Sequence, residues 1–388
     1  MINHLQFIPK NFIKLADNKK VIFNDINLKT DYIINIMNDL IIKYFYSNNF
    51  NTVINLSSLI LKQKYGKQYN HYIDYLIQNG FMFKTSKYFV GKKCNTYKLN
   101  VLEYKDIKRV RISDNILIKK LASKIESITD STESSIDIKI RQKLISDLEY
   151  ITLDVDKSIE YLNKQNMDHY KYNSNMISID NIKYKYKFIK FDGYGRFHTN
   201  FTNLKRHIRK EYIKIDGLYN LEMDIPNSQP MFLSILMKEI LKPEEINEEI
   251  SNFLNLVIDG LIYAHFEKIY PEIYKKRCDA KIMIYKVLFG ENKEFEKENK
   301  IFKKEFPSVF SFIKRYKDKN GFYQSLAHKL QRLESDFIFG EVVKDVYDNI
   351  PNIHIFTIHD SICFPYTYKN QVELIFNKHL DILKKKII

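Results

Sequence analysis

Two aspartates stand where a chain can hold a carboxylate rigidly. In residues 220–230, apolar and acidic residues alternate up to Asp224, and Pro226 then ends the predicted strand by withdrawing a backbone donor. In residues 353–364, two apolar runs flank His359 and Asp360, which predicts a hairpin with this pair at its tip. Each acid alone also fits an ordinary cap or turn. Brought together from separate strands, the two carboxylates could hold two divalent cations.

Between these aspartates, residues 276–290 carry two cations and two aromatic residues at steps of four, namely Arg277, Lys281, Tyr285 and Phe289. Each step of four rotates by only about 40° around a helix, so the four side chains share one broad face. Such a face suits a triphosphate that is held by the cations while its base stacks on the rings. A partly exposed helix, with the rings in the core and the cations in solvent, is the structural alternative.

The elements that must position these residues belong to a chain of 388 residues, 45% of them hydrophobic, which is enough for two or three domains. We expect a small domain at 1–105, a helical connector or thumb-like element at 106–180, and a third region at 181–388 that holds the motifs. Within the connector, the Ser/Thr/Asp-rich stretch 127–137 is predicted to be a loop. The sequence contains no internal repeat.

The first of these regions has the element order of a winged helix. Periodicity predicts helices at 31–45, 56–64 and 68–79, and Gly80 then stops the third helix before a predicted hairpin at 81–100. The stretch resembles the winged-helix family, with 68–79 in the place of the recognition helix and four lysines in the wing: Lys84, Lys87, Lys92 and Lys93. DNA binding, protein contacts and an unrelated small α+β unit all stay open for it.

The charge of the chain favours a polyanionic partner. Lys and Arg number 62 against 47 Asp and Glu, so the formal net charge is +15 and is spread along the sequence. Cations that bind phosphates supply affinity for nucleic acid without regard to its sequence. AT-rich coding, which favours Lys, Asn and Ile, explains the same excess and remains an alternative.

The cysteines and the apolar runs predict a soluble protein in a reducing, cytoplasmic setting, within the host cell if the source is viral. Cys94, Cys278 and Cys363 lie far apart without paired spacing, so neither a disulfide framework nor a zinc site is indicated. No apolar run approaches the roughly 18 residues of a membrane helix, and the first residues lack the apolar stretch of a signal peptide.

Taken in order, the motifs resemble the family A DNA polymerases and the related single-subunit RNA polymerases of phages and mitochondria. The segment RCDAKIMIYKVLFG is similar to a family helix that ends at a glycine, here Gly290. GYGRFHTNFTNLKRHIR contains the Gly-Arg and Asn-Leu steps of another family segment, at Arg196 and Asn203. KEFPSVFSFI, YQSLAHKLQRLESDFI with Gln331, and IHDS continue the match, which spans residues 193–365.

This resemblance implies an α+β fold, in which a right-hand polymerase palm with an antiparallel sheet and helical fingers follows the winged-helix-like domain and the helical connector. It implies a DNA polymerase that transfers nucleotides from dNTPs to the 3′-hydroxyl of a DNA primer-template, with two Mg²⁺ ions as cofactors or Mn²⁺ in their place. The metal ligands would be the carboxylates of Asp224 and Asp360 and the backbone carbonyl of Ile225. Replication of a phage, plasmid or other mobile element is the expected setting, with replication accessory proteins as further partners and no membrane.

The other residues take their roles from the same resemblance. Lys281 would act at the α-phosphate or protonate the leaving group, Arg277 would grip the γ-phosphate, and Tyr285 would stack on the incoming base. Arg196, Asn203 and Gln331 would bind primer and template. His359 would contact the growing strand or the triphosphate.

Three departures bear on the choice of sugar. Family DNA polymerases have a Glu five residues after the first Asp, and Gln229 stands there, preceded by Ser228. Phe289 replaces a tyrosine whose hydroxyl senses the ribose in RNA-synthesising members, which favours dNTPs. Ser361 after His-Asp resembles the RNA-polymerase branch. An RNA polymerase or primase-like enzyme is therefore the first alternative, and a non-catalytic DNA-binding replication initiator is the second.

Overall fold

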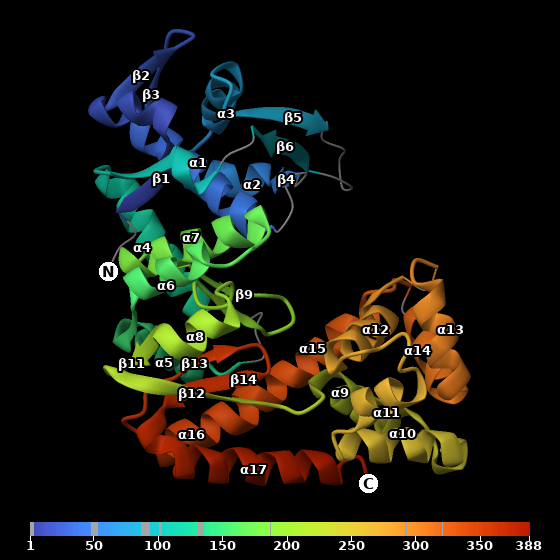
Figure 1. The fold of residues 1–388 in the computed structure, drawn as a ribbon. Coiled ribbons are helices and arrows are strands. Elements are labelled where there is room, and N and C mark those ends of the chain that lie inside the picture. Colours follow the sequence, from blue (N-terminus) through green and yellow to red (C-terminus); the bar gives the residue numbers. More distant parts are fainter. Residues whose placement is uncertain are drawn as a thin grey trace. The chain divides into compact units, whose positions relative to one another are not determined.

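The computed structural model describes residues 4–47, 53–86, 94–100, 103–130, 136–186, 188–291, 293–319 and 321–388, with the backbone alone at 124–130. The chain forms two compact units, coloured by sequence in Figure 1. The first unit contains Met1–Ser131, Thr152–Lys190 and His198–Lys214. The second contains Thr132–Ile151, Phe191–Phe197 and Ile215–Ile388. Four short strands lie where the chain passes between them: β8 (Ile151–Leu153), β9 (Ile189–Phe191), β10 (Phe197–Thr199) and β11 (Ile213–Ile215).

The first unit is built around α1 (Thr30–Tyr46), a helix that is buried on nearly every side because most of its residues are apolar. Two antiparallel pairs, β1 (Leu5–Pro9) with β7 (Ile107–Arg111) and β2 (Lys20–Phe23) with β3 (Ile26–Lys29), belong to this unit. A three-stranded sheet has the order β4-β6-β5. The remaining elements before residue 105 are η1 (Lys10–Asp17), β4 (Ile54–Leu56), α2 (Ser58–Tyr65), α3 (Tyr69–Gln78), β5 (Met82–Ser86) and β6 (Asn95–Leu99).

The helices and hairpin strands expected before residue 100 are present within a few residues of their predicted bounds. Gly80 follows α3 with a φ of 72°, the left-handed conformation of a helix C-terminus. Strand β4, which the sequence reading omitted, pairs with β6. Lys84 lies in β5, whereas Lys87, Lys92 and Lys93 are outside the described residues. The winged-helix assignment, and DNA binding by α3, stay predictions.

The compact units cross the boundaries that we expected near residues 105 and 180. Helix α7 (His169–Lys183) belongs to the first unit because Ser178 and Asn181 donate to the hydroxyl of Tyr46 on α1, at 3.3 and 3.1 Å. Helix α5 (Ile138–Asp147) belongs to the second unit, since buried Asp147 accepts from the backbone amide of Ile355 at 3.0 Å. The connector therefore contributes helices to both units.

Three more helices complete the first unit: α4 (Asn115–Asp130), α6 (Val155–Asn163) and α8 (Arg206–Tyr212). Helix α4 continues four residues into the loop expected at 127–137, and residues 131–135 of that loop lie outside the described residues. Short 3₁₀ segments occur at η2 (Tyr104–Asp106) and, in the second unit, at η3 (Leu148–Tyr150), η4 (Pro243–Glu245) and η6 (Tyr366–Tyr368).

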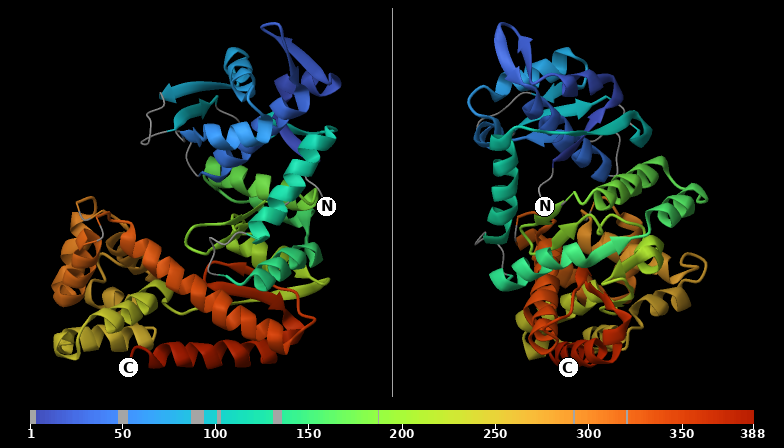
Figure 2. Two further views of the ribbon diagram at one scale, coloured as in Figure 1. Left: turned by 180° about the vertical axis from the view of Figure 1, so that it is seen from behind. Right: turned by 90° about the vertical axis from the view of Figure 1, so that its left-hand side faces the viewer.

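The second unit has an antiparallel sheet in the order β13-β14-β12, formed by β13 (Phe356–Ile358), β14 (Ser361–Pro365) and β12 (Leu218–Asp224). Helix α15 (Ser325–Ser335), the π-helix η5 (Asp336–Val343) and α16 (Lys344–Asn349) follow one another as a long rod beside α17 (Lys369–Lys385), as Figure 2 shows. The other helices are α9 (Ser228–Ile240), α10 (Glu248–Ile258), α11 (Ile262–Ile269), α12 (Arg277–Phe289), α13 (Glu296–Glu305) and α14 (Pro307–Lys319).

Antiparallel sheets and mainly separate runs of helices make the chain an α+β protein, as expected from the sequence. The more detailed assignment of a palm and fingers is not settled by these elements alone. Across the described ranges, none of the helices has both the length and the apolar character needed to cross a bilayer.

Candidate active site

The strand register brings the two predicted aspartates together. Strand β12 runs antiparallel to β14 with Asp224 opposite Ser361, and β13 pairs with β14 so that Ile358 also lies opposite Ser361. His359 and Asp360 therefore form the tip of the hairpin, at the end of β12. The hydroxyl of Ser361 donates to the carbonyl of Ile358 at 2.9 Å, which helps to close this turn. The sequence predicted the strand end at Asp224 and the hairpin tip at Asp360, whereas the register that brings the two together is seen only in the structure.

The carboxyl of Asp360 lies in an unusually negative environment. Burial, which is the largest cause, and the charges of Glu334 and Asp224 together raise its pKa to about 7. The ammonium of Lys281 acts in the opposite direction, which means that α12 lies within electrostatic reach of the hairpin tip. Two aspartates and one glutamate thus concentrate negative charge at the end of β12.

Glu334 is a site residue that the sequence reading missed. Its side chain is 2% exposed, and it accepts from Arg196 through Nη2 at 2.6 Å and Nε at 3.1 Å. It also accepts from the hydroxyl of Ser228 at 2.7 Å and from the amide of Gln229. The signal in the sequence was its place on α15, four residues after Leu330 and eight after Leu326, where the apolar stripe of that helix predicts another buried side chain.

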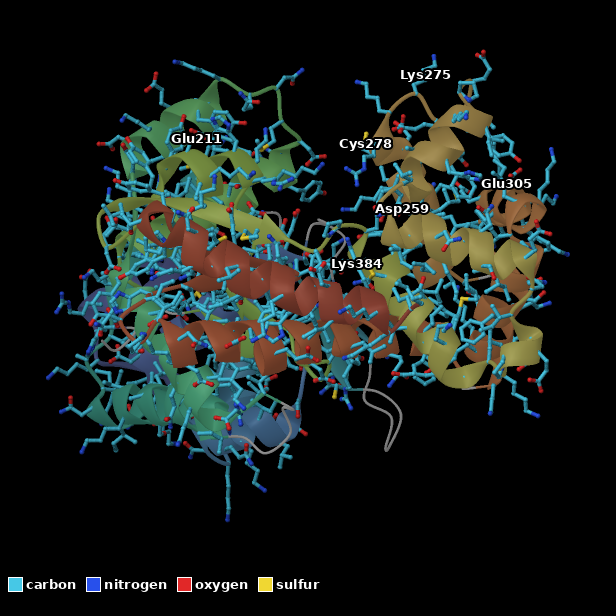
Figure 3. All side chains as sticks on the ribbon, turned by 90° about the horizontal axis from the view of Figure 1, so that it is seen from below. Glu211, Asp259, Lys275, Cys278, Glu305 and Lys384 are labelled. Carbon is cyan, nitrogen blue, oxygen red and sulfur yellow. The ribbon has the colours of Figure 1, made fainter. Side chains whose placement is uncertain are left out.

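The predicted face of α12 is continuous in the structure. Lys281 Nζ lies 5.3 Å from the centre of the Tyr285 ring, and the Tyr285 and Phe289 rings are 5.3 Å apart. Arg277 and Lys281 are exposed, whereas the two rings are half-buried. Lys275 and Cys278, labelled in Figure 3, mark the exposed beginning of this helix. Exposed cations and half-buried rings fit both a nucleotide-binding face and the alternative of a partly exposed helix, so nucleotide binding by this face stays a prediction.

Two further residues, Asn227 and Tyr263, contact the first turn of α12. Arg277 donates to Asn227 Oδ1 at 3.3 Å, and its guanidinium lies 5.5 Å from the centre of the Tyr263 ring. Asn227 adopts a left-handed conformation with a φ of 51° just after β12. Its Nδ2 and the Oε1 of Gln229 are buried and have no hydrogen-bond partner among the residues that the structure describes. Buried polar atoms without a partner are uncommon in folded proteins, which singles out these two atoms.

The phenol of Tyr285 lies near the acidic groups. Burial is the main cause that raises its pKa, and the neighbouring Tyr263 and the charges of Asp360 and Glu334 raise it further. The hydroxyl therefore stays protonated at neutral pH and can donate a hydrogen bond. This is independent evidence that α12 and the hairpin tip line the same site.

The remaining predicted residues occupy different surroundings. Gln331 is half-buried on α15, one turn before Glu334, and His359 has a φ of 53°, which is uncommon for a residue other than glycine. Ile225 is 3% exposed directly after β12. Asn203 lies in the first unit, so its expected role beside the second-unit residues stays a prediction.

The carboxylates of the site suit divalent cations whose other ligands are waters and substrate phosphates. In the described parts of the chain, no three His, Cys, Asp or Glu side chains are grouped so that they could hold a metal ion. Glu334 is already engaged by Arg196, Ser228 and Gln229, so the carboxylates proposed as metal ligands are those of Asp224 and Asp360. Mg²⁺ is commonly held by one or two carboxylates together with waters and substrate phosphates. A cation would also relieve the crowding of negative charge that raises the pKa of Asp360.

No protein-family model and no curated protein matches this sequence. Among solved structures, the chain is similar to the POL domain of Pol1 from M. smegmatis, described as a complex with DNA primer-template and dNTP. The TM-score is 0.47 and the sequence identity is 10%, over 69% of this chain and 70% of that chain.

Proposed function

We propose that this protein is a template-directed DNA polymerase of the family A type, which transfers nucleotides from dNTPs to the 3′-hydroxyl of a primer. The observation that carries the proposal is the strand register that sets Asp224 opposite Ser361 and so beside Asp360. Lys281, on a helix between these strands in the sequence, acts electrostatically on Asp360. Two acids beside a cationic and aromatic helix face are what nucleotidyl transfer from a triphosphate requires.

Asp224, Asp360 and the backbone carbonyl of Ile225 would hold two Mg²⁺ ions, or Mn²⁺ in their place. When bound, the ions would activate the primer hydroxyl and stabilise the leaving pyrophosphate. The two carboxylates are suited to this because the strands that carry Asp224 and that follow Asp360 are joined in one ladder, which fixes the backbone at both positions before substrate binds. His359, at the same hairpin tip, would contact the growing strand or the triphosphate.

Helix α12 would bind the incoming nucleotide. Arg277 and Lys281 are exposed cations that would pair with phosphate oxygens. Lys281 would also act at the α-phosphate or protonate the leaving group. Tyr285 and Phe289 would stack on the base. Asn227 would hold Arg277 in place through its Oδ1, with its Nδ2 directed to the ligand.

Gln229 would discriminate between sugars. It stands where family DNA polymerases have a glutamate, its amide donates to buried Glu334, and its Oε1 has no partner among the described residues. Glu334 thereby links Gln229, Ser228 and Arg196 into one network. Phe289 has no hydroxyl to sense a ribose, which favours dNTPs.

Primer and template would be bound by Arg196, Asn203 and Gln331, and by the winged-helix-like region of the first unit. The net charge of +15 supports a nucleic-acid partner. Replication of a phage, plasmid or other mobile element inside a cell, with accessory proteins, is the setting that we propose.

The test is primer extension by the purified full-length protein on a DNA primer-template with Mg²⁺, with dNTPs and rNTPs supplied in turn. The expected result is template-directed extension with dNTPs. Extension with rNTPs alone would indicate the RNA polymerase or primase-like alternative. Binding of the primer-template without extension by either set would refute the enzyme and leave the replication initiator.

A further inference from the structure

A lysine in the core of the second unit holds the end of α12. Lys317, in the last turn of α14, is 2% exposed. Its Nζ donates to the carbonyl of Val287 and to the carbonyl of Gly290, each at 2.8 Å. No ion pair of this ammonium is seen within the described ranges.

The burial of this ammonium needs a physical reason. Removing a charge from water costs several kcal/mol unless hydrogen bonds compensate for it. Burial accordingly lowers the pKa of Lys317 to about 8. The last carbonyls of a helix have no partner within that helix, and a cation near them interacts favourably with the negative end of the helix dipole. Lys317 thus caps α12 from a neighbouring helix.

Helix α14 is itself anchored at its other end. The carboxylate of Glu249, on α10, accepts from the backbone amide of Ser308 at 2.9 Å and from that of Val309 at 3.4 Å. These bonds fix the first turn of α14, while Lys317 reaches α12 from the last turn. The position of α12 is therefore tied through α14 to α10.

The two carbonyls that accept from Lys317 lie on either side of one aromatic residue in the sequence. Val287 and Gly290 lie two residues before and one residue after Phe289, so their carbonyls define the turn that bears this ring. Space there is tight, since a Cβ added at Gly290 would come within 2.2 Å of the Phe295 ring and 2.6 Å of the carbonyl of Lys286. A displaced last turn would move Phe289 and, through ring contact, Tyr285.

We propose that Lys317 is a positioning residue that sets the nucleotide-stacking end of α12. The proposal rests on the proposed function, because it assigns the bound group as the base of an incoming nucleotide. Loss of the two bonds would weaken nucleotide binding and leave primer-template binding unchanged.

The test compares Lys317→Met, which keeps the aliphatic volume and removes both donors, with Lys317→Arg, which keeps donors, and with Val309→Ala. Val309 is a matched control because its side chain is also buried on α14, in the first turn and not the last, and the substitution keeps the backbone amide that bonds Glu249. In primer extension we expect Lys317→Met to raise the KM for dNTP about tenfold. The primer-template Kd stays at the wild-type value, and Lys317→Arg restores part of the effect. An unchanged KM in folded Lys317→Met, or an equal rise in Val309→Ala, overturns the proposal.

Two further measurements cover the remaining outcomes. If Lys317→Met does not fold, Gly290→Ala crowds the same turn, and a wild-type KM in that variant refutes the role of this turn in nucleotide binding. Amide hydrogen exchange separates this inference from the proposed function. Even if the wild type incorporates no nucleotide, Lys317→Met must exchange the amides of residues 287–290 faster than Val309→Ala does, and equal rates refute the cap.

Discussion

On the strand side of the candidate site the charged groups are acidic, from exposed Asp224 to buried Glu334, whereas on the helix side they are cationic and exposed. Asp360 lies at a hairpin tip where burial and neighbouring acids raise its pKa to about 7, and Glu334 is 2% exposed. Arg277 and Lys281 on α12 face solvent. The strand side is fixed by a ladder of backbone bonds, while the helix side is held by side chains, notably Lys317.

This difference in charge predicts which kind of ligand each side of the site binds. Acids that lie close together repel one another, and a bound cation relieves this repulsion, so the strand side favours metal ions. Exposed cations are well solvated in the unbound protein, and they gain charge-assisted hydrogen bonds when a polyanion replaces that water. The helix side therefore favours phosphates. A nucleotide with its metal ions would satisfy both sides at once.

The largest effect is expected from changes to the strand side. Asp224→Asn and Asp360→Asn each remove a carboxylate that no other described side chain replaces, and we expect kcat/KM in primer extension to fall about 1,000-fold or more. Asp348→Asn is the matched control, because Asp348 is an exposed aspartate of the same unit and should keep wild-type activity. Extension that survives either site substitution would mean that the reaction occurs elsewhere.

The ion pair of buried Glu334 with Arg196 should contribute more to stability than an exposed ion pair does. Glu334→Ala leaves the enclosed guanidinium of Arg196 without its partner, and we expect the free energy of unfolding to drop by about 3–5 kcal/mol. Glu160→Ala breaks the exposed pair with Lys164 and should lower the free energy of unfolding much less, because water solvates both charges. Urea denaturation measures both. Equal losses would show that the network around Glu334 does not hold the strand side together.

The pH dependence of stability tests the buried lysine on the helix side. The pKa of Lys317 is about 8 in the folded protein against an ordinary 10.5, so between these values the unfolded chain binds more protons. The contribution of Lys317 to stability therefore rises with pH in this window and is constant below pH 8. We expect the difference in unfolding free energy between wild type and Lys317→Met to increase by about 3 kcal/mol from pH 8 to 10.5. A flat difference would show that the ammonium is not enclosed.

The smallest effect is expected at the exposed end of α12. Among the described residues, the side-chain acceptor of Arg277 is Asn227, so Arg277→Ala should change the free energy of unfolding by less than about 1 kcal/mol. The KM for dNTP should nevertheless rise about tenfold, since a charge-assisted bond to phosphate is lost. Lys275→Ala, at an exposed lysine just before the helix (Figure 3), is the control and should leave the KM unchanged. An equal rise in both variants would indicate only a general effect of charge.

Much of the site could be predicted because its residues follow local rules. Strand alternation placed Asp224 at a strand end, and the spacing of four placed Arg277 to Phe289 on one face. The register between β12 and β14 depends on side-chain packing between distant segments, so local patterns predicted the two strand ends without their pairing.

Glu334 and Lys317 were missed for a common reason. Each is a charged residue in a helix that also carries other charges, and such residues are usually solvated. Their burial depends on partners more than twenty residues away in the sequence, Arg196 for Glu334 and the end of α12 for Lys317. The grouping of α7 with α1 likewise depends on bonds from Ser178 and Asn181 to Tyr46, which local periodicity does not reveal.

The most direct test of the account is the number of Mn²⁺ ions bound when the protein is saturated with a dideoxy-terminated primer, its template and the matching dNTP. Electron paramagnetic resonance of the free ion gives this number. The account predicts about two ions per wild-type complex and per Asp348→Asn complex, and the loss of at least one in Asp224→Asn and in Asp360→Asn. The same number in wild type and in both site variants would contradict it.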